Sequence, residues 1–170
     1  IETGGIQWMT AGRGIIHSEM PEQENGRIQG YQLWVNLPSN AKMIPPAYQE
    51  FAAPCIPNET LETGGRITVL SGKTNAGTIG PVVNYHTDPI YLDIRLTSGE
   101  KFFQDIPHTH SVIIYVINGD LGFDQEDTML HARRLAVLSN GHKVEITAGQ
   151  TGAHILLIAG KKLNEPIYRN

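Results

Sequence analysis

Two residues near the start of the chain, His17 and Glu19, have the types and the spacing of a pair of metal ligands. Residues two apart on an extended strand project to the same face, so the two side chains would point together. Imidazole nitrogen and carboxylate oxygen are ligands for iron, manganese, nickel or zinc. Two ligands do not hold a metal tightly, so one or two more must come from neighbouring strands. Because the spacing is short and common by chance, two surface residues that share a hydrogen bond are the alternative.

The residues before this pair, Thr10–Gly14 with the sequence TAGRG, could form either a phosphate-binding loop or a turn. A phosphate loop lies between a strand and the N-terminus of a helix. Here the following run, IIHSEMP, is strand-like and ends in proline, and no Lys-Ser or Lys-Thr pair follows. The pattern therefore favours a tight bend that Gly12 and Gly14 allow, with Arg13 free to reach a carboxylate or a carbonyl.

The composition of the 170-residue chain argues against several functional classes. Hydrophobic residues make up 40% and charged residues 18%, which is typical of a protein with a packed core. The net charge is −4, and short basic pairs such as Lys161-Lys162 are better interpreted as solvated surface, so direct nucleic-acid binding is not supported. No apolar run approaches the roughly 18 residues of a membrane span. The single cysteine, Cys55, fits a reducing compartment, so we expect a cytoplasmic location, or a nuclear one in a eukaryote.

The elements that would position these residues are mostly strands. Apolar alternation or β-branched runs predict strands over Tyr31–Leu37, Arg66–Gly72, Ile90–Leu96 and Val112–Asp120, the last closed by an Asn-Gly turn. The runs RRLAVLSNG, HKVEIT and AHILLIAG repeat the pattern, and the last two are joined by AGQTG. Helical periodicity is nearly absent, and the best candidate is a single turn over Pro45–Phe51. Many short strands with glycine-rich turns predict an all-β sandwich or barrel.

A segment rich in Pro, Asn, Glu and Thr, residues 52–63, is expected to be a linker that divides the chain. Residues 64–160 contain enough strands for a complete small barrel, and residues 161–170 follow as a tail. Residues 1–51 offer only three strands, around Ile6–Met9, Ile15–Ser18 and Tyr31–Leu37. Three strands are too few to shield a core, so we expect them to add to another sheet or to lack partners that precede them.

The run GGIQWMTAGRGIIHSEMP, followed by YQLWVNLPSNAKMIPPAYQE, resembles the pirin family of bicupin proteins, in the cupin superfamily. The similarity continues more weakly through VLSGKTNAG, IYLDIRL, IYVINGD and ILLIAGKKLNEPI, and so covers nearly the whole chain. It implies two jelly-roll barrels of the double-stranded β-helix type, of which the first, residues 1–51, is present only in part. It also implies that the family's C-terminal extension is absent.

The resemblance implies a non-haem Fe(II) site in the first barrel, held by three His and one Glu, and no metal in the second. His17 and Glu19 match two of these four ligands. The other two His ligands belong to a His-x-His motif several dozen residues upstream, which this sequence does not contain. His108 and His110 form a similar pair, but Ile114 stands where a metal-binding Glu would follow, so we expect a structural role for them. We expect His86, His131, His142 and His154 to be surface residues or satisfied core histidines rather than ligands.

Two functions of different classes follow from the resemblance. One is a quercetin 2,3-dioxygenase-like reaction, in which the heterocyclic ring of a flavonol is opened with Fe(II) and O2 and Glu19 also acts as a general base. The surroundings of the ligands would then be formed by Gln7, Trp8, Met9 and Arg13. The alternative is a redox-sensitive iron-binding regulator without enzymatic activity that binds transcriptional or metabolic partner proteins. The unpaired strands of the first barrel would also favour self-association.

Overall fold

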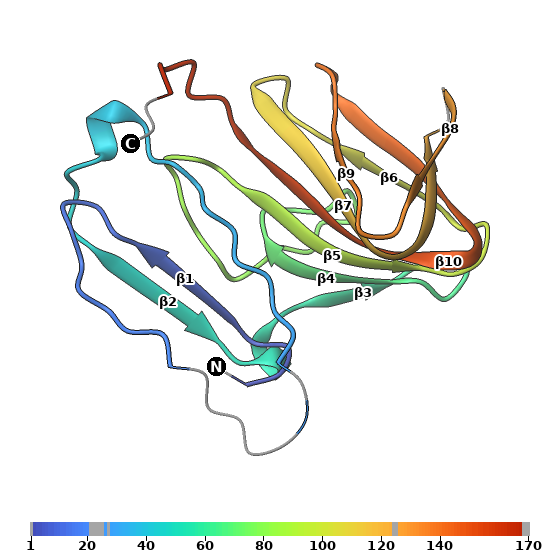
Figure 1. Cartoon of the computed structure of the whole chain (residues 1–170), viewed down its shortest axis with the longest axis horizontal. Helices are drawn as coiled ribbons and strands as arrows, with labels where there is room; N and C mark the ends of the chain where they lie inside the picture. The colour runs from blue at the N-terminus through green and yellow to red at the C-terminus, as the bar shows by residue number, and fades with distance from the viewer. Residues whose placement is uncertain (1, 21–25, 27, 124–125, 168–170) are drawn as a thin grey trace.

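The computed structural model describes residues 2–20, 26, 28–123 and 126–167. Its strands form two sheets, a two-stranded first sheet and an eight-stranded second sheet, with antiparallel pairing throughout both (Figure 1). Apart from two short 3-10 turns, η1 (Ser39–Ala41) and η2 (Ala53–Cys55), the described residues contain no helix. The all-β prediction is therefore confirmed. In the described part of the chain, no helix is long and apolar enough to cross a membrane.

The first sheet pairs β1 (Ile6–Thr10) with β2 (Ala47–Phe51). β1 is the expected strand around Ile6–Met9. β2 corrects the helical turn expected over Pro45–Phe51, because a ladder of hydrogen bonds to β1 stabilises these residues, whereas a single isolated helical turn is unstable. Gln49 of β2 joins this sheet to the second one, since its side-chain amide accepts from Val83 N at 3.0 Å and donates to Val83 O at 2.9 Å.

Two expected strands, over Ile15–Ser18 and Tyr31–Leu37, are not strands in the structure. A strand forms only where a neighbour supplies hydrogen bonds, and within the described ranges no other segment pairs with these two. Residues 28–38 instead run beside the second sheet, drawn in pale blue in Figure 1. The ring of Tyr31 meets that of Tyr115 edge to face, with 5.9 Å between the centroids.

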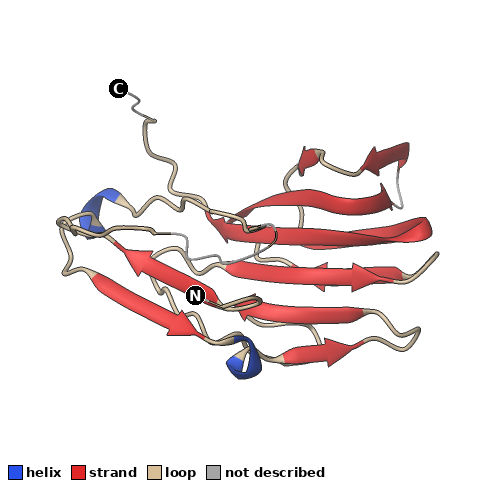
Figure 2. Ribbon diagram, turned by 60° about the horizontal axis from the view of Figure 1, so that its bottom comes forward, coloured by secondary structure: helices blue, strands red, loops and turns tan. Residues whose placement is uncertain are grey.

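The second sheet contains eight strands in the spatial order β3-β4-β5-β10-β7-β8, with β6 beside β10 and β9 beside β7. Their bounds are β3 (Asn58–Thr60), β4 (Arg66–Ser71), β5 (Ile90–Leu96), β6 (Lys101–Asp105), β7 (His110–Phe123), β8 (Glu126–His131), β9 (Leu135–Val137) and β10 (Lys143–Lys161). β10 is shared, because its first part pairs with β6, its last part pairs with β5, and β7 runs along both. The sheet therefore curls around one core as a jelly-roll barrel, called the second barrel below (Figure 2).

β7 and β10 are irregular at the same point, where two glycines meet. Gly119 has a φ of +77° and Gly152 a φ of +78°, and a Cβ on Gly119 would lie only 2.1 Å from the carbonyl oxygen of Gly152. The register of the ladder shifts between Ala148 and Ala153. Two expectations are corrected here. The Asn-Gly pair does not end the strand, which continues to Phe123, and AGQTG is an irregularity inside one strand rather than a connection between two.

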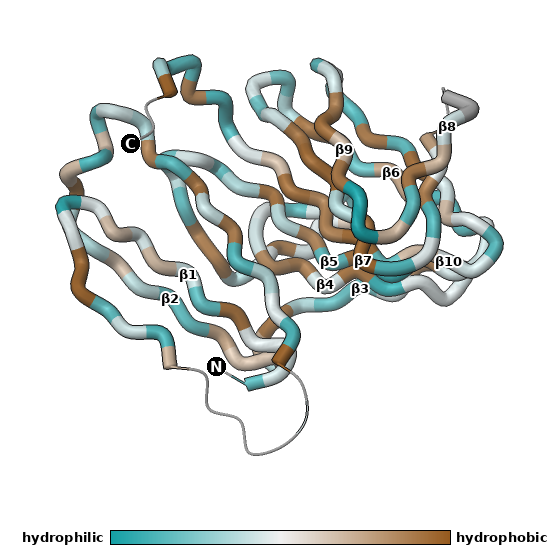
Figure 3. The backbone as a smooth tube through the Cα atoms, viewed as in Figure 1, coloured by the Kyte–Doolittle hydropathy of each residue, from teal (hydrophilic) through white to brown (hydrophobic). Residues whose placement is uncertain are grey.

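The interior of the second barrel is filled with aliphatic side chains. Alternate residues of β4, β5, β7 and β10 are buried over most of their length, as their period of two predicts. Figure 3 shows hydrophobic residues concentrated along β7 and β10. Burial of each large aliphatic side chain contributes about 1.5–3 kcal/mol, so this core is a main source of stability. The most completely enclosed members are Ile67, Val69, Leu92, Ile94, Ile114, Val116, Leu121, Ile146, Ile155 and Leu157.

Residues 52–63, expected to be a linker, have regular structure over part of their length. They contain η2, the buried Ile56, and β3, which pairs with β4. β3 is therefore a strand of the second barrel. The domain boundaries drawn at residues 51, 63 and 160 stay a prediction.

Candidate metal centre

The turn that precedes His17 is held by the chain that leads into β2. Gly12 and Gly14 have φ values of +53° and +123°, in a region that favours glycine. A Cβ on Gly12 would lie 2.1 Å from the carbonyl oxygen of Ile44, which also accepts a hydrogen bond from Arg13 N at 3.0 Å. The expected tight bend is confirmed. A phosphate loop is excluded, because residues 15–20 do not form the helix that such a loop requires.

His17 and Glu19 face each other after this turn. Nε2 of His17 lies 3.9 Å from Oε1 of Glu19. The two side chains are 46% and 68% exposed, so solvent reaches both of them. They do not lie on a strand, but the spacing of two residues still brings them to the same side of the chain. Their role as metal ligands stays a prediction.

A third side chain, that of Gln32, reaches the same carboxylate. Its Nε2 donates to Oε2 of Glu19 at 3.5 Å, the long limit of a hydrogen bond. Gln32 lies next to Tyr31, which contacts Tyr115 of β7. Residues 28–38 therefore connect Glu19 with the second barrel. Sequence reasoning missed Gln32, and the only signal was its place among the polar positions of an alternating run.

The donor types of this pair suit a metal, but the number of donors does not. Ligand bonds of about 2.1 Å place two ligands of one ion roughly 3–4 Å apart. The His17–Glu19 distance of 3.9 Å lies within that range. However, the part of the chain that the structure describes contains no group of three or more His, Cys, Asp or Glu side chains that could hold an ion. The described residues therefore supply at most half of a four-ligand iron site and do not fit the metal on their own.

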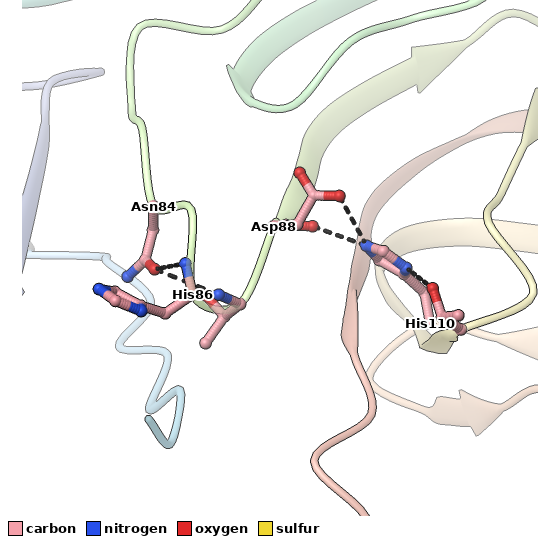
Figure 4. A network of polar contacts seen from close by, with 6 residues as sticks. Asn84, His86, Asp88 and His110 are labelled. Carbon is pink, nitrogen blue, oxygen red and sulfur yellow. Dashed lines mark hydrogen bonds and ion pairs between the residues drawn. The ribbon is translucent and has the colours of Figure 1, made fainter. Parts of the chain in front are cut away.

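His108 and His110 have different partners. His110 is 5% exposed, with Nε2 at 2.7 Å from Asp88 O and Nδ1 at 3.2 Å from the hydroxyl of Thr109 (Figure 4). His108 contacts the ring of His142, with 5.5 Å between the centroids. The contacts of His110 tie the start of β7 to the loop before β5. They support the structural role that was expected for this pair.

Two further histidines each pair with one aspartate of the second barrel. Nδ1 of His131 lies 2.7 Å from Oδ1 of Asp120, and Nε2 of His154 lies 2.8 Å from Oδ1 of Asp93. Neither pair belongs to a larger group of donors among the described residues. The expectation that these histidines are surface residues or are satisfied by hydrogen bonds agrees with this geometry.

Tyr91 lies on the same face of β5 as Asp93 and has an unusual environment. Burial raises the pKa of Tyr91 to about 12, and the negative charge of Asp93 and the proximity of Tyr31 add to the effect. The phenol therefore stays protonated at neutral pH and is not available as a base. Before the structure, nothing distinguished Tyr91 from the other outward-facing positions of this strand.

The four residues expected to surround the ligands lie on β1 and on the turn that follows it. Gln7 donates to Oε1 of Glu50 at 3.3 Å across the first sheet, Trp8 and Met9 are half-buried, and Arg13 is exposed. These positions place them close to His17 in the chain. Their part in a metal site or a substrate pocket stays a prediction.

Two family models and several curated proteins match this chain. The model described as Pirin matches residues 1–35, and the model described as Pirin C-terminal cupin domain matches residues 91–170. A pirin-like protein of Caulobacter vibrioides is 42% identical over 168 residues, which cover 99% of this chain and 60% of the relative. Human pirin is 40% identical over 170 residues, which cover 98% of this chain and 57% of the relative. The chain thus spans about three fifths of the length of these relatives.

Solved structures share the same architecture. A quercetin 2,3-dioxygenase from Acinetobacter baumannii superposes with a TM-score of 0.80 at 25% identity, covering 100% of this chain and 60% of that one. A protein from Geobacillus kaustophilus superposes with a TM-score of 0.77 at 30% identity, covering 95% of this chain and 65% of that one. The strand topology and these matches define an all-β protein of the cupin type. Within that class, the chain belongs to the pirin family.

Proposed function

We propose that His17 and Glu19 are two of the ligands of a non-haem Fe(II) site in a pirin-like cupin protein. The observation that supports this most directly is the 3.9 Å approach of the two side chains, which follows the glycine turn within the segment that the pirin model matches. Two further His ligands would come from outside the described residues. Imidazole and carboxylate donors with open coordination positions suit oxygen chemistry at iron.

For the activity, we propose a quercetin 2,3-dioxygenase-like oxidation of a flavonol or a similar small aromatic molecule with O2. The A. baumannii structure that bears this name covers the whole of this chain at 25% identity. Glu19 would accept the proton of the substrate hydroxyl. Its carboxylate is exposed to solvent, so a substrate could come within hydrogen-bond distance of it. Gln32, which donates to Oε2 of Glu19, would orient the carboxylate for this role.

The second candidate is a redox-sensitive iron-binding regulator that binds transcriptional or metabolic partner proteins and catalyses no reaction. Exposed apolar side chains close to the ligand pair favour it, since Ile16, Met20 and Trp34 are 103%, 80% and 87% exposed. Large apolar groups that reach solvent are typical of a surface that another polypeptide covers. The same groups would support self-association of the first part of the chain. The exposed, unpaired Cys55 fits a cytoplasmic or nuclear location.

Iron content tests the ligand assignment. The chain is fused to the His-x-His segment of a pirin relative, loaded with Fe(II) in the absence of oxygen, and analysed for bound iron. We expect the fusion to bind one iron ion per chain and to lose most of it after His17→Ala. His131→Ala is the matched control, because His131 is an exposed histidine paired with Asp120 in the second barrel. Unchanged iron content after His17→Ala would show that the assignment is wrong.

Oxygen uptake separates the two candidate functions. The iron-loaded fusion is mixed with quercetin and with related flavonols, and O2 consumption is followed together with loss of the flavonol. For an oxygenase we expect uptake that falls strongly in Glu19→Gln. Stoichiometric iron without oxygen uptake from any flavonol would favour the regulator.

A further inference from the structure

A second candidate site lies apart from the ligand pair, where three segments distant in the sequence meet. A pocket of about 310 Å³ opens between the residues around η1, the loop before β5 and the end of β10. Its polar lining consists of Asn40, Tyr85, His86, Lys161 and Lys162. A volume of this size is at the lower end of those that hold small molecules.

Backbone hydrogen bonds fix the wall of the pocket that carries the two lysines. Lys161 N donates to Thr87 O and Lys162 N donates to Thr109 O, each at 2.8 Å. The end of β10 is thus held between the loop before β5 and the loop before β7. Because these bonds use only backbone atoms, the lysine side chains can be changed without removing them.

The loop that carries His86 is fixed by its own hydrogen bonds. Oδ1 of Asn84 accepts from His86 N at 3.1 Å and from Thr87 N at 3.2 Å. The buried ring of His110 bonds to Asp88 O at 2.7 Å at the far side of the loop. Figure 4 shows that the His86 ring points away from His110. Its imidazole is therefore presented to the pocket on a loop that is already ordered.

The pocket gathers positive charge in a chain whose net charge is −4. Lys161, Lys162 and His86 are among the residues that line it, and none of the described residues in its lining is acidic. Two carboxylates lie two residues from the lining in the sequence. Oδ2 of Asp88 lies 3.5 Å from Nε2 of His110, and Glu165 accepts hydrogen bonds from Ser39 N at 2.8 and 3.0 Å. The hydrogen bonds from Ser39 lower the pKa of Glu165, and the positive charge of Lys42 adds to the effect. The charged carboxylate of Glu165 is therefore already bonded to Ser39. Cationic groups that surround an open space attract a small anion into it.

We propose that this pocket binds a small organic anion through its phosphate or carboxylate oxygens. Lys161 and Lys162 supply charge-assisted hydrogen bonds to such oxygens, and the imidazole of His86, the amide of Asn40 and the hydroxyl of Tyr85 supply further ones. Lys162 Nζ also donates to Asn140, which orients its ammonium group. A bound anion would contact both the first part of the chain and the second barrel. The site does not depend on the proposed iron site.

Backbone amide chemical shifts of the full chain test the proposal. The protein is titrated with inorganic phosphate and, in a separate series, with citrate, while sodium chloride keeps the ionic strength constant. We expect saturable shifts at the amides of His86, Lys161 and Lys162. Lys161→Gln should weaken binding roughly three- to fivefold, the effect of one partly exposed charge. Lys143→Gln is the matched control, because it makes the same charge change at the opposite end of β10 and should leave the affinity unchanged.

The two titrations also identify the chemical source of the anion. Tighter binding of phosphate would indicate a phosphate ester as the ligand, and tighter binding of citrate would indicate a polycarboxylate. The proposal is overturned if the shifts do not saturate, or if sodium chloride alone reproduces them. It is also overturned if Lys161→Gln and His86→Gln both bind the anion as tightly as Lys143→Gln does.

Discussion

Glu100 is a buried carboxylate of the second barrel and lies directly before β6. Its side chain is enclosed, and its oxygens accept hydrogen bonds from Gly65 N at 3.3 Å, from Thr97 N at 2.7 Å and from the Thr97 hydroxyl at 3.0 Å. Burial by itself raises the pKa of Glu100, but these hydrogen bonds and one from Thr63 outweigh it, so the pKa lies below its usual value. Folding therefore stabilises the charged form of Glu100 relative to the protonated form.

We predict that Glu100 makes the fold sensitive to acid. A carboxyl group whose pKa is lowered by folding stabilises the protein above its pKa in the unfolded chain, and this contribution is lost as the pH falls through the folded value. Glu100→Gln should lower the free energy of unfolding by about 1–3 kcal/mol at neutral pH and by less in acid. Urea unfolding at a series of pH values measures the difference, with the exposed Glu62→Gln as control. An equal loss at every pH would mean that packing, not charge, is responsible.

Residue types and spacing predicted some of the site but not its surroundings. His17 and Glu19 do come together, because a spacing of two residues acts locally and needs no distant partner. Gln32 was not predicted, since its contact with Glu19 depends on how residues 28–38 run beside the second sheet. Lys161-Lys162 was interpreted as solvated surface for the same reason, because the other walls of the pocket come from distant parts of the chain.

At the scale of elements, the close approach of Gly119 and Gly152 is the most demanding feature of the second barrel. We predict that Gly119→Ala costs more than about 3 kcal/mol of unfolding free energy, since its Cβ would meet a backbone oxygen at 2.1 Å and its φ is +77°. Gly99→Ala is the matched control, because Gly99 has a φ of +68° but nothing within 4 Å of the added Cβ. It should cost only about 1–2 kcal/mol, the conformational part alone. Similar losses for the two variants would show that β7 and β10 separate easily at this point.

Elements were predictable where the pattern and the pairing agree. β5 is an example, because alternate residues of Ile90–Leu96 face the core and two neighbours supply its ladder. The strands predicted over Ile15–Ser18 and Tyr31–Leu37 were wrong. The sequence of a segment does not indicate whether another strand is available to pair with it. The irregularity at Gly119 was interpreted as a turn, since glycine in a left-handed conformation serves both purposes and only the partner strand distinguishes them.

At the scale of the whole molecule, three contacts among the described residues join the first part of the chain to the second barrel and to the segment that follows it. Gln49 makes two hydrogen bonds with the backbone of Val83, Glu165 accepts from Ser39 N, and the Tyr31 ring meets the Tyr115 ring. All three are at least partly exposed. The resemblance to pirins predicted two structural parts in one chain, but which side chains hold them together depends on packing between segments that are distant in the sequence.

We predict that Gln49→Ala loosens the first sheet without unfolding the second barrel. The substitution removes both hydrogen bonds to Val83 and leaves the β1–β2 ladder in place. Limited proteolysis should then cut residues 11–46 faster than in the unchanged protein, while residues 64–160 stay protected. Gln7→Ala is the control, because the hydrogen bond of Gln7 to Glu50 lies within the first sheet. Equal cutting rates for both variants would show that Gln49 does not hold the two parts together.

The shared strand β10 also determines when the second barrel can be completed. β5, β6 and β7 all precede β10 in the chain, and each of them hydrogen-bonds to it. During synthesis, therefore, none of the three has its full set of partners until residues 143–161 have left the ribosome. Pairing over such sequence distances is slow, and open strand edges associate with other chains. A nascent chain of this protein is accordingly most exposed to misassembly just before its last long strand emerges.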